Sequence, residues 1–100
     1  MKNPTTYEAF IETLVDKSPG NSWPSTLKAL WWDAKGDWHT AHDLVDGSGA
    51  EHANWVHAYL HRKEGDRWNA GYWYRRANRP FPEKSLEQEW EDLVEFLVQN

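Results

Sequence analysis

The sequence predicts an all-α domain in which two helical hairpins stack and further helices flank them at both ends. The first observation behind this prediction is a pattern that occurs twice, once around Gly36-Asp37 and once around Gly65-Asp66. In both copies an alanine follows five residues after the glycine, and helix-like segments lie on either side. Glycine suits the left-handed position just after a helix, and aspartate is a preferred N-cap of the next helix. Each copy therefore predicts two antiparallel helices joined by a tight turn.

The second observation is that apolar residues recur at helical spacing and that no segment is convincing as a strand. One hundred residues are enough for one core and too few for two. We therefore expect one helical-repeat domain over residues 1–100, arranged as a right-handed stack of two hairpins. The hairpins are predicted at about 24–46 and 50–78, with flanking helices at about 5–17 and 85–98.

The first flanking helix is marked by a capping box and an apolar stripe. Thr5 and Glu8 have the spacing of such a box. The stripe at helical spacing consists of Tyr7, Phe10, Ile11, Leu14 and Val15. The Ser-Pro-Gly-Asn sequence of residues 18–21 ends this helix.

The two hairpins follow. Pro24 suits the first turn of the second helix, Asp37 caps the third, and the glycines of residues 47–49 break the chain. The apolar residues of this hairpin are Leu27, Leu30, Trp31, Ala34, Trp38, Ala41, Leu44 and Val45. The second hairpin carries Ala53, Trp55, Val56, Tyr59, Leu60, Trp68, Ala70, Trp73, Tyr74 and Ala77. The two prolines of residues 79–82 end its second helix.

The last helix has the clearest amphipathic pattern of the chain. Ser85 and Gln88 form a second capping box. The apolar stripe that follows consists of Leu86, Trp90, Leu93, Val94 and Leu97.

The segment from Asn54 to Pro82 resembles a tetratricopeptide-type repeat. The residues at the characteristic places of that family are Ala58, Gly65, Ala70, Tyr74, Ala77 and Pro82. The first hairpin matches less well, with Val45 at the aromatic place. The period of 29 residues is also shorter than the usual 34 of the family. The resemblance implies a helical hairpin fold and a function in binding proteins or peptides.

Composition excludes several classes of protein. The chain has no cysteine, so disulfides and thiolate metal sites are absent. Because no stretch suits a membrane span or a signal peptide, we expect a cytoplasmic protein. The net charge is −5, with basic residues concentrated in 61–80 and acidic residues in 83–100. We expect these two segments to pair with each other, and we expect no binding to nucleic acids or membranes.

The repeat resemblance also implies a concave face that a partner would occupy. Its residues are Trp23, Leu30, Asp33, His52, Trp55, Tyr59, Arg62 and Lys63. Aromatic side chains beside cations suit the recognition of an acidic peptide or a carboxylate. In the alternative interpretation, the last helix covers this face with Leu86, Trp90 and Leu93.

A group of histidines forms an alternative pocket. His57 and His61 lie four residues apart on one predicted helix, with Glu64 one turn further on, and His42 or His39 of the first hairpin lies within reach. This spacing permits chelation of a metal, but the glutamate that follows the first histidine in metalloprotease motifs is replaced by Ala58. A helical wheel predicts that these residues form an exposed polar stripe. Alignment of the two hairpins as repeats, which we call the repeat register, predicts instead that the histidines are buried. In this register His61 lies near the following helix and His57 near the preceding hairpin. We assign no metal ion, cofactor or catalytic residue.

Two functions follow from these patterns. The first is a non-enzymatic interaction module that binds a protein or peptide. The alternative is a small-molecule-binding or metal-binding protein, or an enzyme, whose pocket holds His42, His57, His61 and Glu64. The sequence does not indicate the partner or the oligomeric state.

Overall fold

The computed structural model describes residues 3–100, and this part of the chain contains helices and no strand. Six α-helices and one short 3-10 helix follow one another. They are α1 (Tyr7–Glu12), η1 (Thr13–Val15), α2 (Ser25–Ala34), α3 (Trp38–Val45), α4 (Glu51–Lys63), α5 (Arg67–Arg76) and α6 (Leu86–Gln99). The predicted all-α fold class is confirmed, and adjacent helices pack as pairs.

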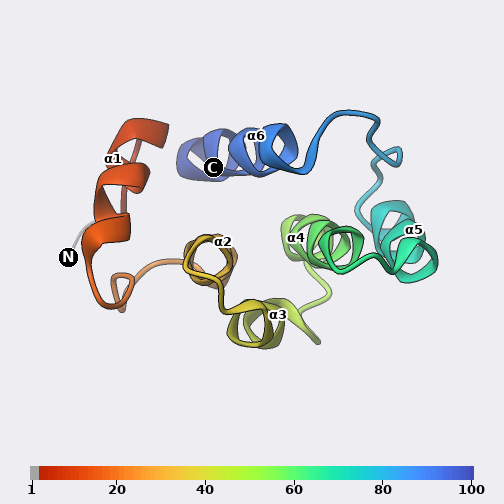
Figure 1. Cartoon of the computed structure of the whole chain (residues 1–100), viewed down its shortest axis with the longest axis horizontal. Helices are drawn as coiled ribbons and strands as arrows, with labels where there is room; N and C mark the ends of the chain where they lie inside the picture. The colour runs from red at the N-terminus through yellow and green to blue at the C-terminus, as the bar shows by residue number, and fades with distance from the viewer. Residues whose placement is uncertain (1–2) are drawn as a thin grey trace.

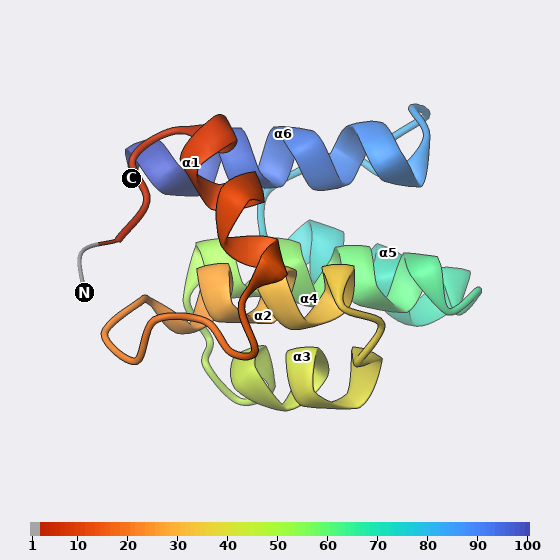
Figure 2. The same ribbon diagram turned by 60° about the vertical axis from the view of Figure 1, so that its left-hand side comes forward.

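The two hairpins pack side by side, and the flanking helices lie against one face of them. Helix α2 packs on α3, α4 packs on α5, and α4 joins the hairpins by contacting both α2 and α3 (Figure 1). Helix α6 packs on α1, α2 and α4. Figure 2 shows α1 and α6 on one side of α2 and α4, with α3 on the opposite side. The last helix therefore turns back over the inner helices of both hairpins.

The repeated Gly-Asp pattern produces the same turn twice. Gly36 and Gly65 have φ angles of +89° and +90°, in the left-handed region that favours glycine. The amide of Asp37 donates to the carbonyl of Trp32, and that of Asp66 donates to the carbonyl of His61. Both bonds are 2.9 Å long and close the six-residue loop of a Schellman motif. This turn fixes the angle at which each hairpin folds back.

Side-chain caps begin four of the helices. Asp37 accepts a hydrogen bond from the amide of Thr40, Asp66 from that of Asn69, and Ser85 from that of Gln88, as predicted. The predicted cap at Thr5 is wrong. Thr6 has the extended backbone of an N-cap residue and accepts from the amide of Ala9, so α1 begins one residue later than the Thr5 box requires.

Tryptophan side chains link separate helices through their indole N–H groups. The indole of Trp31 donates to the carbonyl of Thr13, that of Trp38 to Leu60 at 2.8 Å, and that of Trp90 to Leu30. A buried indole that finds an acceptor adds a directional contact to its large apolar surface. These three bonds tie η1 to α2, α3 to α4, and α6 to α2.

Along residues 3–100, the helices are all too short or too polar to cross a membrane.

We expect two glycine substitutions in the second hairpin to change stability in opposite directions. Gly65→Ala should lower the free energy of unfolding by about 1 kcal/mol, because alanine is strained at a positive φ although its Cβ would meet no atom there. Gly71→Ala lies inside α5, where a Cβ would make only an ordinary contact with Arg75, so it should raise stability by up to about 1 kcal/mol. Urea denaturation of both variants measures the difference. Destabilisation by both substitutions to the same extent would contradict this account of the turn.

Candidate functional site

Helix α6 covers much of the face that the repeat register assigns to a partner. Five of the eight predicted residues are buried, namely Trp23, Leu30, Asp33, Trp55 and Tyr59. Arg62 is partly buried, whereas His52 and Lys63 are exposed. Of the three α6 residues expected to cover the face, Leu93 is buried and Leu86 and Trp90 pack against the core. The alternative in which the last helix lies over this face therefore describes the structure.

A buried carboxylate of α6 holds that helix in place. Glu89 is 2% exposed and accepts hydrogen bonds from the hydroxyl of Tyr74, the guanidinium of Arg62 and the indole of Trp55. The Arg62 Nη1 to Glu89 Oε1 distance is 2.8 Å. Arg62 also donates to the backbone carbonyl of Lys84, just before α6. This pair confirms that the basic segment 61–80 meets the acidic final helix.

A second buried carboxylate joins α2 to α4. Asp33 is 3% exposed, and it accepts hydrogen bonds from the hydroxyl of Tyr59 at 2.9 Å and from the ammonium group of Lys63 at 2.8 Å. Burial, together with the negative charge of Asp33, raises the pKa of Tyr59, so this phenol stays protonated and donates. Both cations that the predicted face offers to an acidic partner are thus already paired with carboxylates of this chain.

One part of the predicted face that stays open is a groove between α1, α2, α4 and α6. We call it the α1–α6 groove, and its volume is about 510 Å³. Asp33, Tyr59 and Lys63 are the three predicted residues that line it. The other lining residues are Tyr7, Ile11, Leu14, Ala34, Leu86, Glu87, Trp90 and Glu91. The predicted residues Trp23, Leu30, His52, Trp55 and Arg62 are not among them.

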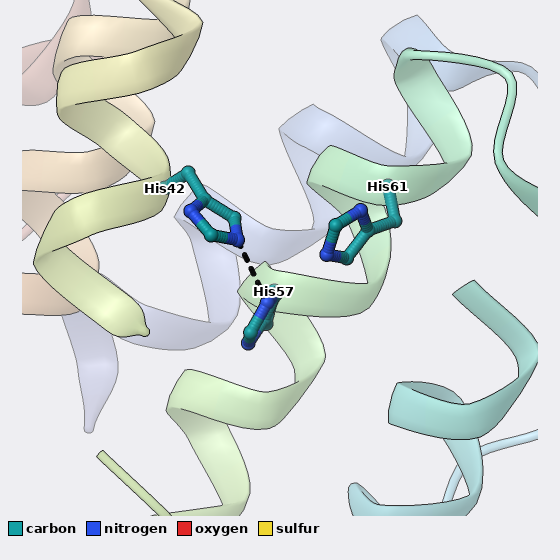
Figure 3. Close-up of side chains that lie close together, drawn as sticks. All are labelled: His42, His57 and His61. Atoms are coloured by element: carbon teal, nitrogen blue, oxygen red, sulfur yellow. Dashed lines mark hydrogen bonds between the residues drawn. The ribbon is translucent and has the colours of Figure 1, made fainter. Parts of the chain in front are cut away.

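The opposite side of α4 carries the histidines of the alternative pocket. The structure brings together His42 of α3 with His57 and His61 of α4, and one ring nitrogen from each lies within 4.8 Å of the other two (Figure 3). The Nε2 atoms of His42 and His57 are 3.0 Å apart and share a hydrogen bond. His39, the other candidate of the first hairpin, is exposed and lies outside this group. We call these three residues the histidine cluster.

Aromatic rings and one carboxylate surround the histidine cluster. Trp38 stacks on His42 at a centroid distance of 4.9 Å, and Trp73 stacks on His57 at 4.0 Å. Glu64, the fourth predicted residue of the pocket, lies 2.7 Å from Nδ1 of His61. His61 is 9% exposed and hydrogen-bonded, as the repeat register predicts. The contact with the following helix differs from the prediction. Trp73 of α5 stacks on His57, and His61 contacts the rings of Trp38 and His42 of α3.

Burial keeps the central imidazole neutral. His57 is 2% exposed, and its Nδ1 has no hydrogen-bond partner among the described residues. Burial lowers the pKa of His57 to about 4, and the positive charges that His42 and His61 can carry act in the same direction, while Asp46 acts weakly against it. At neutral pH, His57 therefore has a lone pair available on one ring nitrogen.

No protein-family model, curated protein or solved structure matches this chain at a significant level. The resemblance to tetratricopeptide repeats therefore stays a prediction, and the function is inferred from the geometry of the two sides of α4.

We expect Glu89→Gln to lower the free energy of unfolding by about 2–4 kcal/mol, because it removes the charge that pairs with the partly buried Arg62. Glu87→Gln is the matched control, since Glu87 lies on the same helix and is exposed, and it should change stability by no more than about 0.5 kcal/mol. Urea denaturation at pH 7 compares the two variants. Equal stabilities would show that the Glu89 contacts do not hold α6.

We expect the protein to lose stability in acid because of His57. Its folded-state pKa lies below the unfolded value, so the unfolded chain binds the proton first and stability falls as pH drops from about 6.5 towards 4. Between pH 7 and pH 5 the loss should be about 2 kcal/mol. Urea denaturation in the presence of a chelator measures this loss. His57→Gln should reduce it and His39→Gln should retain it, and an unchanged loss in His57→Gln would contradict the assignment.

Proposed function

We propose that the protein is a non-enzymatic interaction module whose α1–α6 groove binds a peptide segment with a large apolar side chain next to a lysine or arginine. The observation that carries this proposal is the groove itself, which combines an apolar lining with carboxylates at its edge. The partner is thus a protein or peptide, and the charge expected on it follows from the side chains that are free to pair.

The lining provides apolar surface from two helices that are far apart in the sequence. Ile11 and η1 residue Leu14 form one wall, and Leu86 and Trp90 of α6 form the other. All four side chains are only partly buried, so each keeps surface that a ligand can cover. An apolar side chain that enters such a groove gains about 25 cal/mol for each Å² of apolar surface removed from water.

The charges at the groove favour a basic ligand. Glu87 and Glu91 of α6 line it. Burial and the negative charges of Glu91, Glu95 and Glu8 raise the pKa of Tyr7, which lies in the groove wall. Together with Glu87, four carboxylates therefore contribute negative potential to the groove. The one cation of the lining, Lys63, is 2.8 Å from Asp33 and already neutralised. A ligand cation would reduce the repulsion among the carboxylates.

This proposal retains the predicted class of partner and changes its charge. An acidic peptide would need Arg62 and Lys63 to be free, but they pair with Glu89 and Asp33. An acidic peptide would therefore have to break one of these pairs and leave a buried carboxylate without its cation, at a cost of several kcal/mol.

Selection from a random peptide library displayed on phage tests the proposal. The peptides that the protein enriches should combine a leucine or an aromatic residue with at least one lysine or arginine. Calorimetry should show that Glu91→Lys and Leu14→Glu weaken the best peptide by about tenfold or more, which corresponds to the loss of about 1.4 kcal/mol.

A charge-matched control separates groove binding from general attraction of a basic peptide to an acidic protein. Glu51→Lys makes the same change of charge at the start of α4, at the opposite end of that helix from Lys63, and should leave the affinity within about twofold. If the peptides selected are acidic, or if Glu51→Lys weakens binding as much as Glu91→Lys, the proposal fails.

A further inference from the structure

We propose that the histidine cluster binds one divalent transition-metal ion of the zinc class, with His42, His57 and His61 as its ligands. This inference is independent of the α1–α6 groove, because the cluster lies between α3, α4 and α5, whereas the groove lies between α1, α2, α4 and α6.

The three imidazoles converge from two helices. His57 and His61 are one turn apart on α4, so their rings lie parallel to within 27° with a centroid distance of 4.8 Å. His42 approaches from α3 and meets both rings nearly edge-on, at centroid distances of 4.7 Å and 5.2 Å. Figure 3 shows the rings of His42 and His61 directed towards the region above His57.

The ligand atoms of His42 and His57 already have nearly the spacing that zinc requires, and the full set would contract around the ion. A tetrahedral zinc ion with Zn–N bonds of 2.0–2.1 Å holds its nitrogen ligands about 3.3 Å apart. In the structure the Nε2 atoms of His42 and His57 are 3.0 Å apart, and the full set lies within 4.8 Å. The side chain of His42 is 20% exposed, so this ring has freedom to move. The ion would replace the hydrogen bond between His42 and His57 as the link between α3 and α4.

Neighbouring groups orient the rings as they do in metal sites. The carboxylate of Glu64 lies 2.7 Å from Nδ1 of His61, which leaves Nε2 of that ring as the ligand atom. Stacking fixes the planes of the other two rings, because Trp38 lies flat on His42 and Trp73 lies flat on His57. Trp38 is itself held by its indole bond to the carbonyl of Leu60.

The donor set selects the ion. Three imidazole ligands suit zinc and its neighbours in the first transition series, whereas calcium and magnesium require oxygen ligands. Three protein ligands leave the fourth position of a tetrahedral ion for a solvent molecule. Glu64 and Asp66 also lie near His61, but Asp66 accepts two hydrogen bonds from Asn69 as the N-cap of α5. The imidazoles are therefore the ligand set that remains free to bind.

Metal titration of protein prepared without an affinity tag, and freed of metal by a chelator, tests the proposal. Calorimetry with Zn²⁺ should give one ion per chain, and Co²⁺ should give the visible absorption bands of a tetrahedral site. His42→Gln and His61→Gln should each lower the affinity for Zn²⁺ by at least about 100-fold, and Glu64→Gln, which removes the orienting carboxylate, should lower it by about 10-fold to 100-fold.

The two other histidines provide matched controls. His39 and His52 are exposed on α3 and α4, and neither belongs to the cluster. His39→Gln and His52→Gln should bind Zn²⁺ as the unaltered protein does, and circular dichroism without metal checks that each variant is folded. Binding of less than one Zn²⁺ per chain would overturn the proposal. It would also be overturned if the control His39→Gln lost as much affinity for Zn²⁺ as a folded His42→Gln variant. Neither result bears on peptide binding in the α1–α6 groove, since the cluster variants leave its lining unchanged.

Discussion

Helix α4 lies between α2, α3, α5 and α6, so the polar side chains in its central part have almost no water to bind. Nine consecutive residues, 53–61, are buried, and they include an asparagine, two histidines, a tyrosine and a tryptophan. A buried polar group without a partner costs about 1–3 kcal/mol. The helices around α4 must therefore supply hydrogen-bonding groups at matching positions, and this requirement explains much of the arrangement.

The two sides of α4 meet this requirement in different ways. Towards α2 and α6, carboxylates enter from the neighbouring helices, with Asp33 accepting from Tyr59 and Glu89 accepting from Trp55. Towards α3, two imidazoles bind one another through the Nε2 atoms of His42 and His57. A carboxylate that pairs with a cation leaves neither charged group without a partner. On the histidine side, Nδ1 of the buried His57 has no hydrogen-bond partner among the described residues, and this difference favours the second side as the place of the proposed metal ion.

Local rules made the fold predictable. The Gly-Asp turns and the cap at Ser85 depend only on neighbouring residues, so the sequence was sufficient to predict these turns and this cap. The sequence left open whether α6 covers the predicted concave face, because that position depends on Glu89, which pairs across the fold. The sequence does contain a signal, since Glu89 lies three residues after Leu86 and four before Leu93, and so occupies the apolar stripe. A carboxylate at such a position indicates a buried partner.

The histidines show why a pattern on one helix could not settle the site. The helical wheel correctly grouped His57, His61 and Glu64 on one side, but it could not show that other helices cover that side. Burial comes from α3 and α5 together, through Trp38 and Trp73. The repeat register predicted the burial, yet it assigned the ring contacts with the following helix to His61 instead of His57.

The course of α6 also explains how a stack of only two hairpins is completed. A hairpin array normally buries the inner helices of one repeat against the next, and terminal elements cover the last repeat. Here α6 crosses the inner helices α2 and α4, so the apolar surface that a longer array would present as a concave face becomes core. The outer side of α5 is left to solvent, with Trp68 at 76% exposed and Tyr72 at 37%. The closing helix has a consequence for binding as well, because α1 packs on α6 and the α1–α6 groove lies where these two helices approach α2 and α4. The covering of one face thus creates the open surface that the proposed peptide would occupy.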